Sequence, residues 1–342
     1  MNVRKQDSYF MALKGQDSTE REALVMAADV LFANLSEYNY NPMNDVLFKF
    51  IFGKEERKQI TIDFLNAVLE PSLGHSIKDL TFASTEMNPE HDNDKLTRLD
   101  VSCILDTQEQ VDVEVQVLNK KNMNRRTLFY WAQMYLMSLP AGKTYNDLKP
   151  AITVNLLNFA FLPQEEPHAM YGIYNKANGH QLTKDLELHF LEIPKYANQA
   201  KQKSISQMTK MERWLAYFAN QLDKKGKEEL AMSEAAIQEA MEAARIFFNN
   251  TAERRQYINR EMARMDRESM LQNALNEGVE KGKEKGRAEG RAEGKAEGKA
   301  EGILLFGKLA NILLAEGKSQ DLQTAISNPD FRNVLFKKYH LQ

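Results

Sequence analysis

Apolar and polar positions alternate along two short stretches in the first half of the chain. Residues 99–105 read Leu-Asp-Val-Ser-Cys-Ile-Leu, and residues 111–117 read Val-Asp-Val-Glu-Val-Gln-Val. The odd positions are apolar in both stretches, and the even positions are mostly polar. A period of two with β-branched side chains predicts two half-buried strands. The polar residues 106–110 between them have turn composition, so we expect an antiparallel hairpin.

The predicted hairpin brings two acids together. Both apolar faces must lie on the same core, so the register pairs odd positions with odd and even with even. Asp100 and Glu114 then share one face, and if directly opposite their Cβ atoms lie about 4.5–5.5 Å apart. Two carboxylates this close need a shared proton, a basic neighbour or a cation. Mg²⁺ prefers carboxylate oxygens, and Gln116, on the same side, is placed to orient a water or a phosphate oxygen.

The rest of the first two hundred residues predicts helices mixed with strands. Helical periodicity covers 17–38, and another helix begins near Asp45, which we expect as its N-cap. This helical region has a second part through 60–69, ended by Pro71 and Gly74. We expect a helix at 123–139 and further strands at 77–84, 151–159 and 186–193, of which 151–159 is nearly all apolar and therefore central. This mixture indicates an α/β core.

Several segments together resemble a known family. Asp100, followed fourteen residues later by Glu114-Val115-Gln116, resembles the PD-(D/E)XK nuclease superfamily. The wider context is similar to its branch of recombination-promoting nucleases, also described as PD-(D/E)XK family transposases. The resemblance implies a restriction-endonuclease-like core, in which helices flank a mixed sheet, followed by a helical C-terminal region. The segments that carry it are 44–49, 51–53, 99–101, 113–116, 125–132, 148–152 and 188–194.

This resemblance implies a metal-dependent nuclease. Asp100 and Glu114 would be catalytic acids that bind Mg²⁺, for which Mn²⁺ can substitute, and Gln116 would complete the catalytic set. The implied reaction is hydrolysis of DNA phosphodiester bonds, which leaves 5′-phosphate and 3′-hydroxyl ends. Most of the superfamily has lysine at the position of Gln116, although this branch commonly has glutamine. Without that positive charge, more of the electrostatic stabilisation falls on the metal or on Arg125 and Arg126.

Two further groups have two readings each, and Lys49 has one. Asp45 corresponds to an accessory acid on the first helix, or it only caps that helix. Arg125 and Arg126, at the start of the helix at 123–139, either contact phosphate or are simply solvated. Lys49 joins them as a candidate DNA contact, because a chain with net charge −3 needs a local basic patch to bind DNA.

Composition points to an intracellular protein. The one cysteine, Cys103, lies on the apolar face of a predicted strand and cannot form a disulfide within the chain. No run of eighteen apolar residues predicts a membrane span. Residues 1–16 have no apolar stretch typical of a secretory signal, so we expect a cytoplasmic location.

The chain changes character after about residue 200. We expect an N-terminal helical extension at 1–40, a nuclease-like domain at 41–200, a charged helical region at 201–276 and a small helical tail at 303–342. Between the last two lies a repeat of glycine, lysine or arginine, alanine and glutamate at 277–302, with seven acids and seven bases. Interior glycines each cost a helix about 1 kcal/mol, so this repeat is either a partly helical tether that orders on self-association or a solvated linker.

Two functions follow from these observations. The first is a Mg²⁺-dependent DNA endonuclease of the recombination-promoting or transposase-like type, which forms a homo-oligomer through its C-terminal helices. The alternative is a catalytically silent nuclease fold that acts as an interaction scaffold through its helical tail.

Overall fold

The computed structural model describes residues 40–84, 86–87, 97–199 and 203–341, so the helix predicted at 17–38 lies outside the described residues. The chain divides into two compact units, which we call unit 1 (residues 1–266) and unit 2 (residues 267–342). Helix α10 (Thr251–Ala315) contributes residues to both.

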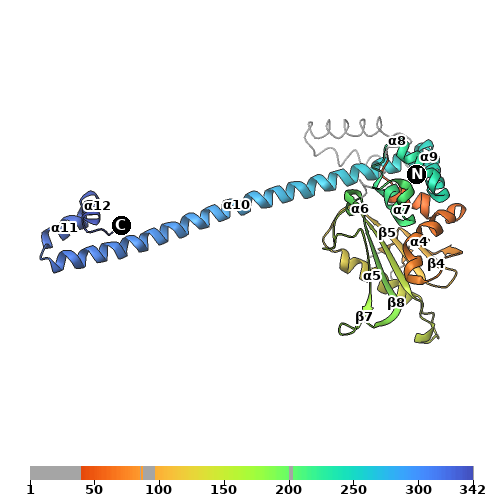
Figure 1. The fold of residues 1–342 in the computed structure, drawn as a ribbon, viewed down its shortest axis with the longest axis horizontal. Helices are drawn as coiled ribbons and strands as arrows, with labels where there is room; N and C mark the ends of the chain where they lie inside the picture. Colours follow the sequence, from red (N-terminus) through yellow and green to blue (C-terminus); the bar gives the residue numbers. More distant parts are fainter. Residues whose placement is uncertain (1–39, 85, 88–96, 200–202, 342) are drawn as a thin grey trace, which may run out of the picture. The chain divides into compact units, whose positions relative to one another are not determined.

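A six-stranded mixed sheet forms the centre of unit 1 (Figure 1). The predicted hairpin is its β4–β5 pair, which is antiparallel. Strands β5, β6 and β8 run parallel to one another, and β7 pairs antiparallel with β8. In spatial order the strands are β1 (Leu80–Phe82), β4 (Val101–Leu105), β5 (Gln110–Gln116), β6 (Ala151–Leu157), β8 (Gln181–Glu192) and β7 (His168–Tyr174). A separate pair joins β2 (Glu86–Met87) to β3 (Thr97–Arg98).

Strand β6 confirms the prediction of a central strand, since all seven of its residues are buried. The structure differs at the far edge, where β8 begins at Gln181 and the unpredicted β7 pairs with it. Four of the seven β7 residues are exposed, and the strand contains Gly172 next to a shift in register. An edge strand of this kind lacks the alternation from which strands are recognised.

One face of the sheet carries the main apolar core. Val111, Val113 and Val115 of β5 pack there with buried residues of several helices. The ring of Phe52 lies 5.7 Å from that of Trp214, measured between centroids. The helices that contribute to this core include α3 (Asp45–Phe52), α4 (Lys58–Leu73), α6 (Ile193–Gln199), α7 (Lys210–Ala219), α8 (Lys224–Ser233) and α9 (Ala235–Asn249).

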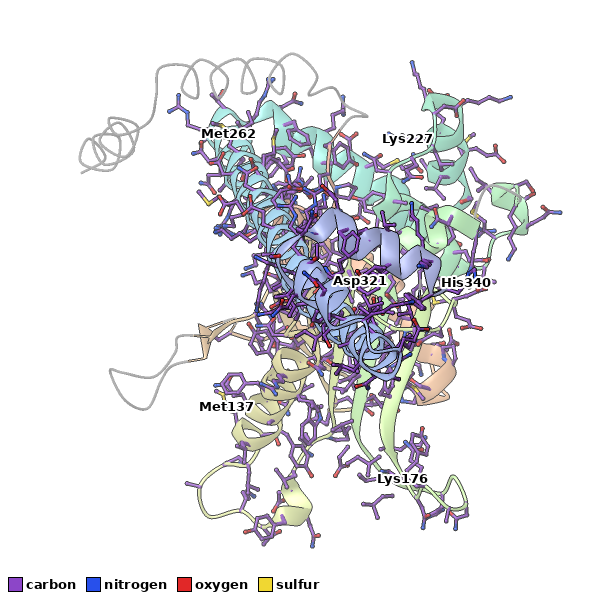
Figure 2. All side chains as sticks on the ribbon, turned by 90° about the vertical axis from the view of Figure 1, so that its left-hand side faces the viewer. Met137, Lys176, Lys227, Met262, Asp321 and His340 are labelled. Atoms are coloured by element: carbon purple, nitrogen blue, oxygen red, sulfur yellow. The ribbon has the colours of Figure 1, made fainter. Side chains whose placement is uncertain are left out.

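Helix α5 (Met123–Met137) covers the opposite face. It packs apolar side chains near its ends, including Met123 and Met134, against smaller clusters. Between them the face is polar, because Thr153 and Asn155 of β6 are both buried there and contact the helix. Figure 2 labels Met137, which ends α5, and Lys176, in the turn between β7 and β8.

Two predictions about helix ends in unit 1 were wrong. Asn44, not Asp45, caps α3, because its side chain accepts from the N–H groups of Val46 and Leu47. Asp45 is the first residue of the helix. Pro71 lies inside the last turn of α4 and does not end it, whereas Gly74 does end it in the left-handed conformation, with φ of +79°.

Unit 2 is helical. The glycine repeat at 277–302 lies entirely within α10, so the expected tether is helical along its length. Apart from the adjacent backbone of α10 itself, a Cβ added at any of the seven repeat glycines would meet no atom of the described residues within 4 Å. Beyond it, α11 (Ser319–Ser327) and α12 (Pro329–Lys338) pack with the end of α10 around Leu309, Leu313 and Leu335. None of the helices in the described part of the chain is long and apolar enough to cross a membrane.

Candidate active site

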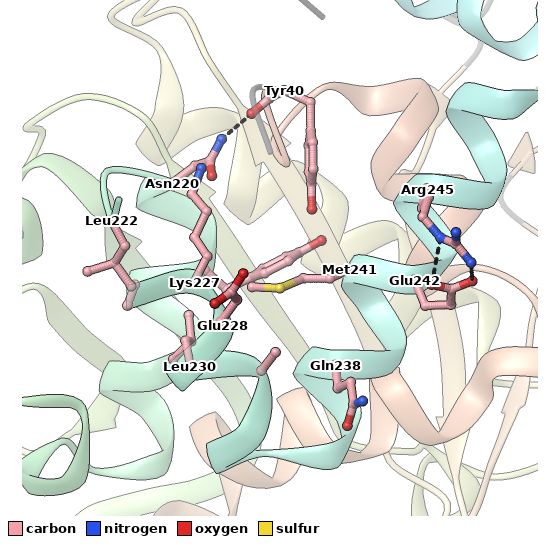
Figure 3. Close-up of a pocket in the computed structure, with 13 residues that line it drawn as sticks. Tyr40, Asn220, Leu222, Lys227, Glu228, Leu230, Gln238, Met241, Glu242 and Arg245 are labelled. Carbon is pink, nitrogen blue, oxygen red and sulfur yellow. Dashed lines mark hydrogen bonds and ion pairs between the residues drawn. The ribbon is translucent and has the colours of Figure 1, made fainter. Parts of the chain in front are cut away.

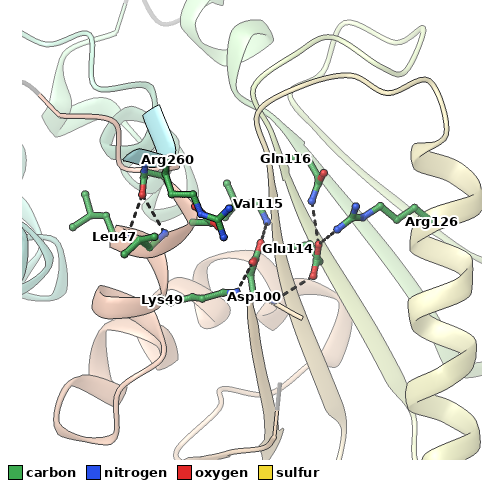
Figure 4. Close-up of polar contacts among 11 residues, drawn as sticks. Leu47, Lys49, Asp100, Glu114, Val115, Gln116, Arg126 and Arg260 are labelled. Atoms are coloured by element: carbon green, nitrogen blue, oxygen red, sulfur yellow. Dashed lines mark hydrogen bonds and ion pairs between the residues drawn. The ribbon is translucent and has the colours of Figure 1, made fainter. Parts of the chain in front are cut away.

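The hairpin register confirms the predicted meeting of Asp100 and Glu114. Val101 pairs with Val113 in β4–β5, which sets Asp100 against Glu114 at the end of the ladder. The Asp100 N–H donates to Glu114 Oε1 at 3.2 Å, and the Val115 N–H donates to Asp100 Oδ2 at 3.0 Å (Figure 4). Each acid is therefore held by the backbone of the other strand, which fixes the two carboxylates close together.

Two cations hold the remaining oxygens of this pair. Lys49 Nζ of α3 lies 3.0 Å from Asp100 Oδ1, and Arg126 Nη2 of α5 lies 2.9 Å from Glu114 Oε2. Gln116 Nε2 also donates to Glu114 Oε2, at 3.1 Å. The structure thus brings Lys49, Arg126 and Gln116 to the two acids, and Figure 4 shows all five side chains converging.

Two of the expected site residues lie elsewhere. Asp45 forms an ion pair with Arg260 of α10, with 3.0 Å between Oδ2 and Nη2. Arg125 is exposed on α5, on a different side of the helix from Arg126. Neither has a contact with Asp100 or Glu114 among the described residues.

A third acid belongs to the site and was missed in the sequence. Asp112 lies two residues before Glu114 on the same face of β5, opposite Ser102 of β4 and Thr153 of β6. Its side chain is fully buried, and neither carboxylate oxygen has a hydrogen-bond partner among the described residues. Asp112, like Asp100 and Glu114, occupies an even position of the alternating pattern. The pattern that identified those two acids therefore also includes Asp112.

Burial and crowding of like charges shift the pKa values of these acids. Burial, and then the Asp100 carboxylate, raise the pKa of Glu114 to about 7, although Arg126 acts in the opposite direction. Burial raises the pKa of Asp112 well above its usual range, with further contributions from Glu114 and Asp100. Two cations therefore face three acids, of which Asp112 and Glu114 are buried, and the site would be stabilised by additional positive charge.

The donor set fits a hard divalent cation. Mg²⁺ commonly takes one or two protein carboxylates and keeps several waters, and Asp100 with Glu114 provides two. Among the described residues no three His, Cys, Asp or Glu side chains converge as a ready metal cluster. The protein would therefore supply two carboxylates, and water or phosphate oxygens would supply the rest.

A pocket of about 370 Å³ opens beside Asp100. Lys49 and Lys54 line it together with Ser102 and Gln256, so a phosphate entering it would meet two lysines next to Asp100. A second pocket, of about 560 Å³, lies among α7, α8 and α9 near Tyr40 and contains none of the hairpin acids (Figure 3). Because Asp100 and Lys49 line the first pocket, the first pocket is the candidate active-site pocket.

A mixed sheet flanked by helices, with opposed acids at the end of its antiparallel hairpin, defines the PD-(D/E)XK nuclease fold. The model of the family described as PD-(D/E)XK nuclease family transposase matches residues 42–274, and the chain belongs to this family. No protein of curated function and no solved structure matches the chain.

Proposed function

We propose that the protein is a Mg²⁺-dependent DNA endonuclease that hydrolyses phosphodiester bonds, with Mn²⁺ able to replace Mg²⁺. The observation that carries this proposal is the opposed pair of Asp100 and Glu114, held by each other's backbone and flanked by Gln116. Family membership supports nuclease chemistry. The proposal also includes a cytoplasmic location and self-association through the C-terminal helices.

In this proposal Asp100 and Glu114 hold the metal. Bound Mg²⁺ would supply Lewis-acid stabilisation of charge on the phosphate. Gln116 orients the attacking water through its amide, and the products carry 5′-phosphate and 3′-hydroxyl ends. Lys49, which is one-third exposed at the pocket, can turn from Asp100 to a DNA phosphate. Arg125, exposed near the start of α5, is a second phosphate contact.

The alternative is a catalytically silent scaffold that acts through its helical tail. One observation favours it: the oxygens of Asp100 and Glu114 already have partners in Lys49, Arg126, Gln116 and the backbone. Large apolar side chains also remain exposed on α10, including those of Ile303, Leu304 and Leu314.

Plasmid cleavage with Mg²⁺ or Mn²⁺ separates the two functions. We expect Asp100→Asn and Glu114→Gln to reduce cleavage at least about 100-fold, because even outer partners of metal ligands contribute 10- to 100-fold. Glu56→Gln, which changes an exposed acid at the surface, is the matched control and should cleave normally. Metal-dependent thermal stabilisation should disappear in Asp100→Asn. Equal cleavage by all variants, or no stabilisation of the wild type by either metal, would contradict the proposal.

A further inference from the structure

Two complementary groups in the buried layer between α5 and the sheet have no hydrogen-bond partner in the part of the chain that the structure describes. Both carboxylate oxygens of Asp112 are buried without one among the described residues, and so is the Nε–H of Arg126. Unpaired buried polar groups are costly, and each calls for an explanation such as a water, an ion or a functional role. One of these groups is an acceptor and the other a donor, and Arg126 is among the charged groups that act on Asp112.

Helix α5 contacts the sheet next to Asp112. Thr127, the next residue of the helix, lies with Oγ1 2.9 Å from Oγ1 of Thr153. Thr153 is the residue of β6 paired with Asp112 in the sheet register. The helix therefore contacts the sheet at the level of Asp112, while the Arg126 guanidinium extends from that level to Glu114.

The ring of Tyr130 keeps the guanidinium inside the layer. It lies 4.8 Å from Arg126 Cζ, measured to the ring centroid. Such a stacking contact can persist while the plane of the guanidinium turns toward a different carboxylate. Arg126 therefore stacks on Tyr130, and two acids that it could pair with, Glu114 and Asp112, lie on the same strand, β5.

The ion pairs that Lys49 and Arg126 form with the hairpin acids must change when the proposed metal binds. Asp100, Asp112 and Glu114 face Lys49 and Arg126, so three acids meet two bases. Lys49 is partly exposed and can move into the pocket. Arg126 stacks on Tyr130, and next to a divalent cation on Glu114 its guanidinium would be repelled.

We propose that Asp112 is a positioning residue that receives Arg126 when Glu114 binds a divalent cation. This inference rests on the proposed function, because it takes Glu114 as a metal ligand. In the present structure Arg126 pairs with Glu114. In the metal-bound protein Arg126 pairs with Asp112, through the donor and acceptor atoms that have no partner within the described ranges. Asp112 therefore frees Glu114 for the metal and keeps the guanidinium close to the scissile phosphate.

A double-mutant cycle tests this exchange in the full-length protein. The variants are Asp112→Asn, Arg126→Gln and the two combined, and the measurement is urea unfolding followed by tryptophan fluorescence. Both tryptophans, Trp131 and Trp214, lie in unit 1 and report its unfolding. The cycle is measured in EDTA, in Mg²⁺, and in EDTA with Glu114→Gln as the background.

We expect little coupling between Asp112 and Arg126 in EDTA, where Glu114 holds the guanidinium. In Mg²⁺ the coupling should reach about tenfold in the unfolding constant, which is about 1.4 kcal/mol. The same coupling should appear in EDTA once Glu114→Gln has removed the competing charge. Arg125→Gln is the matched control on α5 and should show no coupling with Asp112→Asn in any condition.

The outcomes separate this inference from the proposed function. Equal coupling in all three conditions, or none in the Glu114→Gln background, would overturn the exchange. Absence of any Mg²⁺ effect on the wild type would count against the nuclease, while the Glu114→Gln arm would still decide the exchange. If Arg126→Gln does not fold, Arg126→Lys keeps the charge but lacks the Nε donor, and it should lose most of the coupling.

Discussion

Two buried glutamates in unit 1 have similar exposure and opposite surroundings. Glu192, at the end of β8, accepts from the N–H groups of Phe161 and Leu162 and from Lys195. Lys195 is itself held by the Leu162 carbonyl at 2.8 Å, so donors, acceptors and charges balance. Glu114 is equally buried, but it shares two cations with Asp100 and with Asp112. The oxygens of Asp112 have no hydrogen-bond partner among the described residues.

The comparison distinguishes an acid that supports the fold from one available to a ligand. Around Glu192 the charge is matched, so removing one partner leaves the other buried and uncompensated. Around Glu114 negative charge is in excess, so removing it relieves repulsion. The same substitution, glutamate to glutamine, should therefore have opposite effects on stability at the two sites.

The largest expected effect is that of Glu192→Gln. It leaves the Lys195 ammonium without its counter-charge, and we expect it to reduce the free energy of unfolding by about 3–5 kcal/mol. Urea denaturation followed by tryptophan fluorescence measures this loss. If Glu192→Gln reduces the free energy of unfolding by less than about 1 kcal/mol, the charge balance around Glu192 does not distinguish it from Glu114. DNA cleavage per folded molecule should stay at the wild-type level, because the described contacts of Glu192 are with Phe161, Leu162 and Lys195 and do not include the hairpin acids.

Glu114→Gln should instead stabilise the metal-free protein at alkaline pH. Because the folded-state pKa of Glu114 is raised from 4.5 to about 7, folded protein binds the proton more tightly than unfolded protein. The contribution of Glu114 to stability is thus greatest below about pH 4.5 and falls as the pH rises through about 7. The raised pKa corresponds to about 3 kcal/mol above pH 8. Unfolding in EDTA at pH 5 and pH 8 measures this difference.

The comparison must be made between wild type and variant at each pH, because a histidine titrates in an overlapping range. Burial, and then the neighbouring His189, lower the pKa of His168 to about 4. Its contribution has the opposite sign, since stability falls as the pH decreases from about 6.5 to about 4. That contribution is common to wild type and Glu114→Gln and cancels in their difference. A pH-independent difference would show that Glu114 is ionised at its ordinary pKa.

The sequence predicted the strands of this site better than its charge pairing. Period-two alternation places Asp100, Asp112 and Glu114 on one face, because that parity is a local property of a strand. Their partners depend on which helix covers the face, and no local pattern encodes that Lys49 and Arg126 meet these acids. We expected both as DNA contacts, whereas in this structure they form ion pairs with the acids.

Other differences have the same origin. Asp112 could not be recognised as buried until α5 was placed over it, and the edge strand β7 depends on pairing with β8. Asn44 precedes Asp45, and both are good cap residues, so sequence alone did not choose between them. In the glycine repeat, the intrinsic cost of glycine favoured a tether, but lysine–glutamate pairs along α10, such as Lys281 with Glu277, support the helix.

The smallest expected effect on stability is that of Lys49→Met, compared with Lys195→Met. The side chain of Lys49 is 33% exposed and that of Lys195 is 11% exposed. Because solvent screens the Lys49–Asp100 pair, Lys49→Met should change the free energy of unfolding by less than about 1 kcal/mol. Lys195→Met should cost about 3–5 kcal/mol, since it leaves Glu192 buried and charged.

Lys49→Met should change the binding of Mg²⁺ and DNA more than it changes stability. Asp100 loses its competing ammonium, so the affinity for Mg²⁺, measured by calorimetry without DNA, should rise. The salt dependence of DNA binding should weaken by about one phosphate contact if Lys49 turns to the backbone. If Lys49→Met binds Mg²⁺ no better than wild type and keeps the full salt dependence, the Lys49–Asp100 pair is structural. The hairpin acids would then resemble Glu192, with a closed set of partners and no site for a ligand.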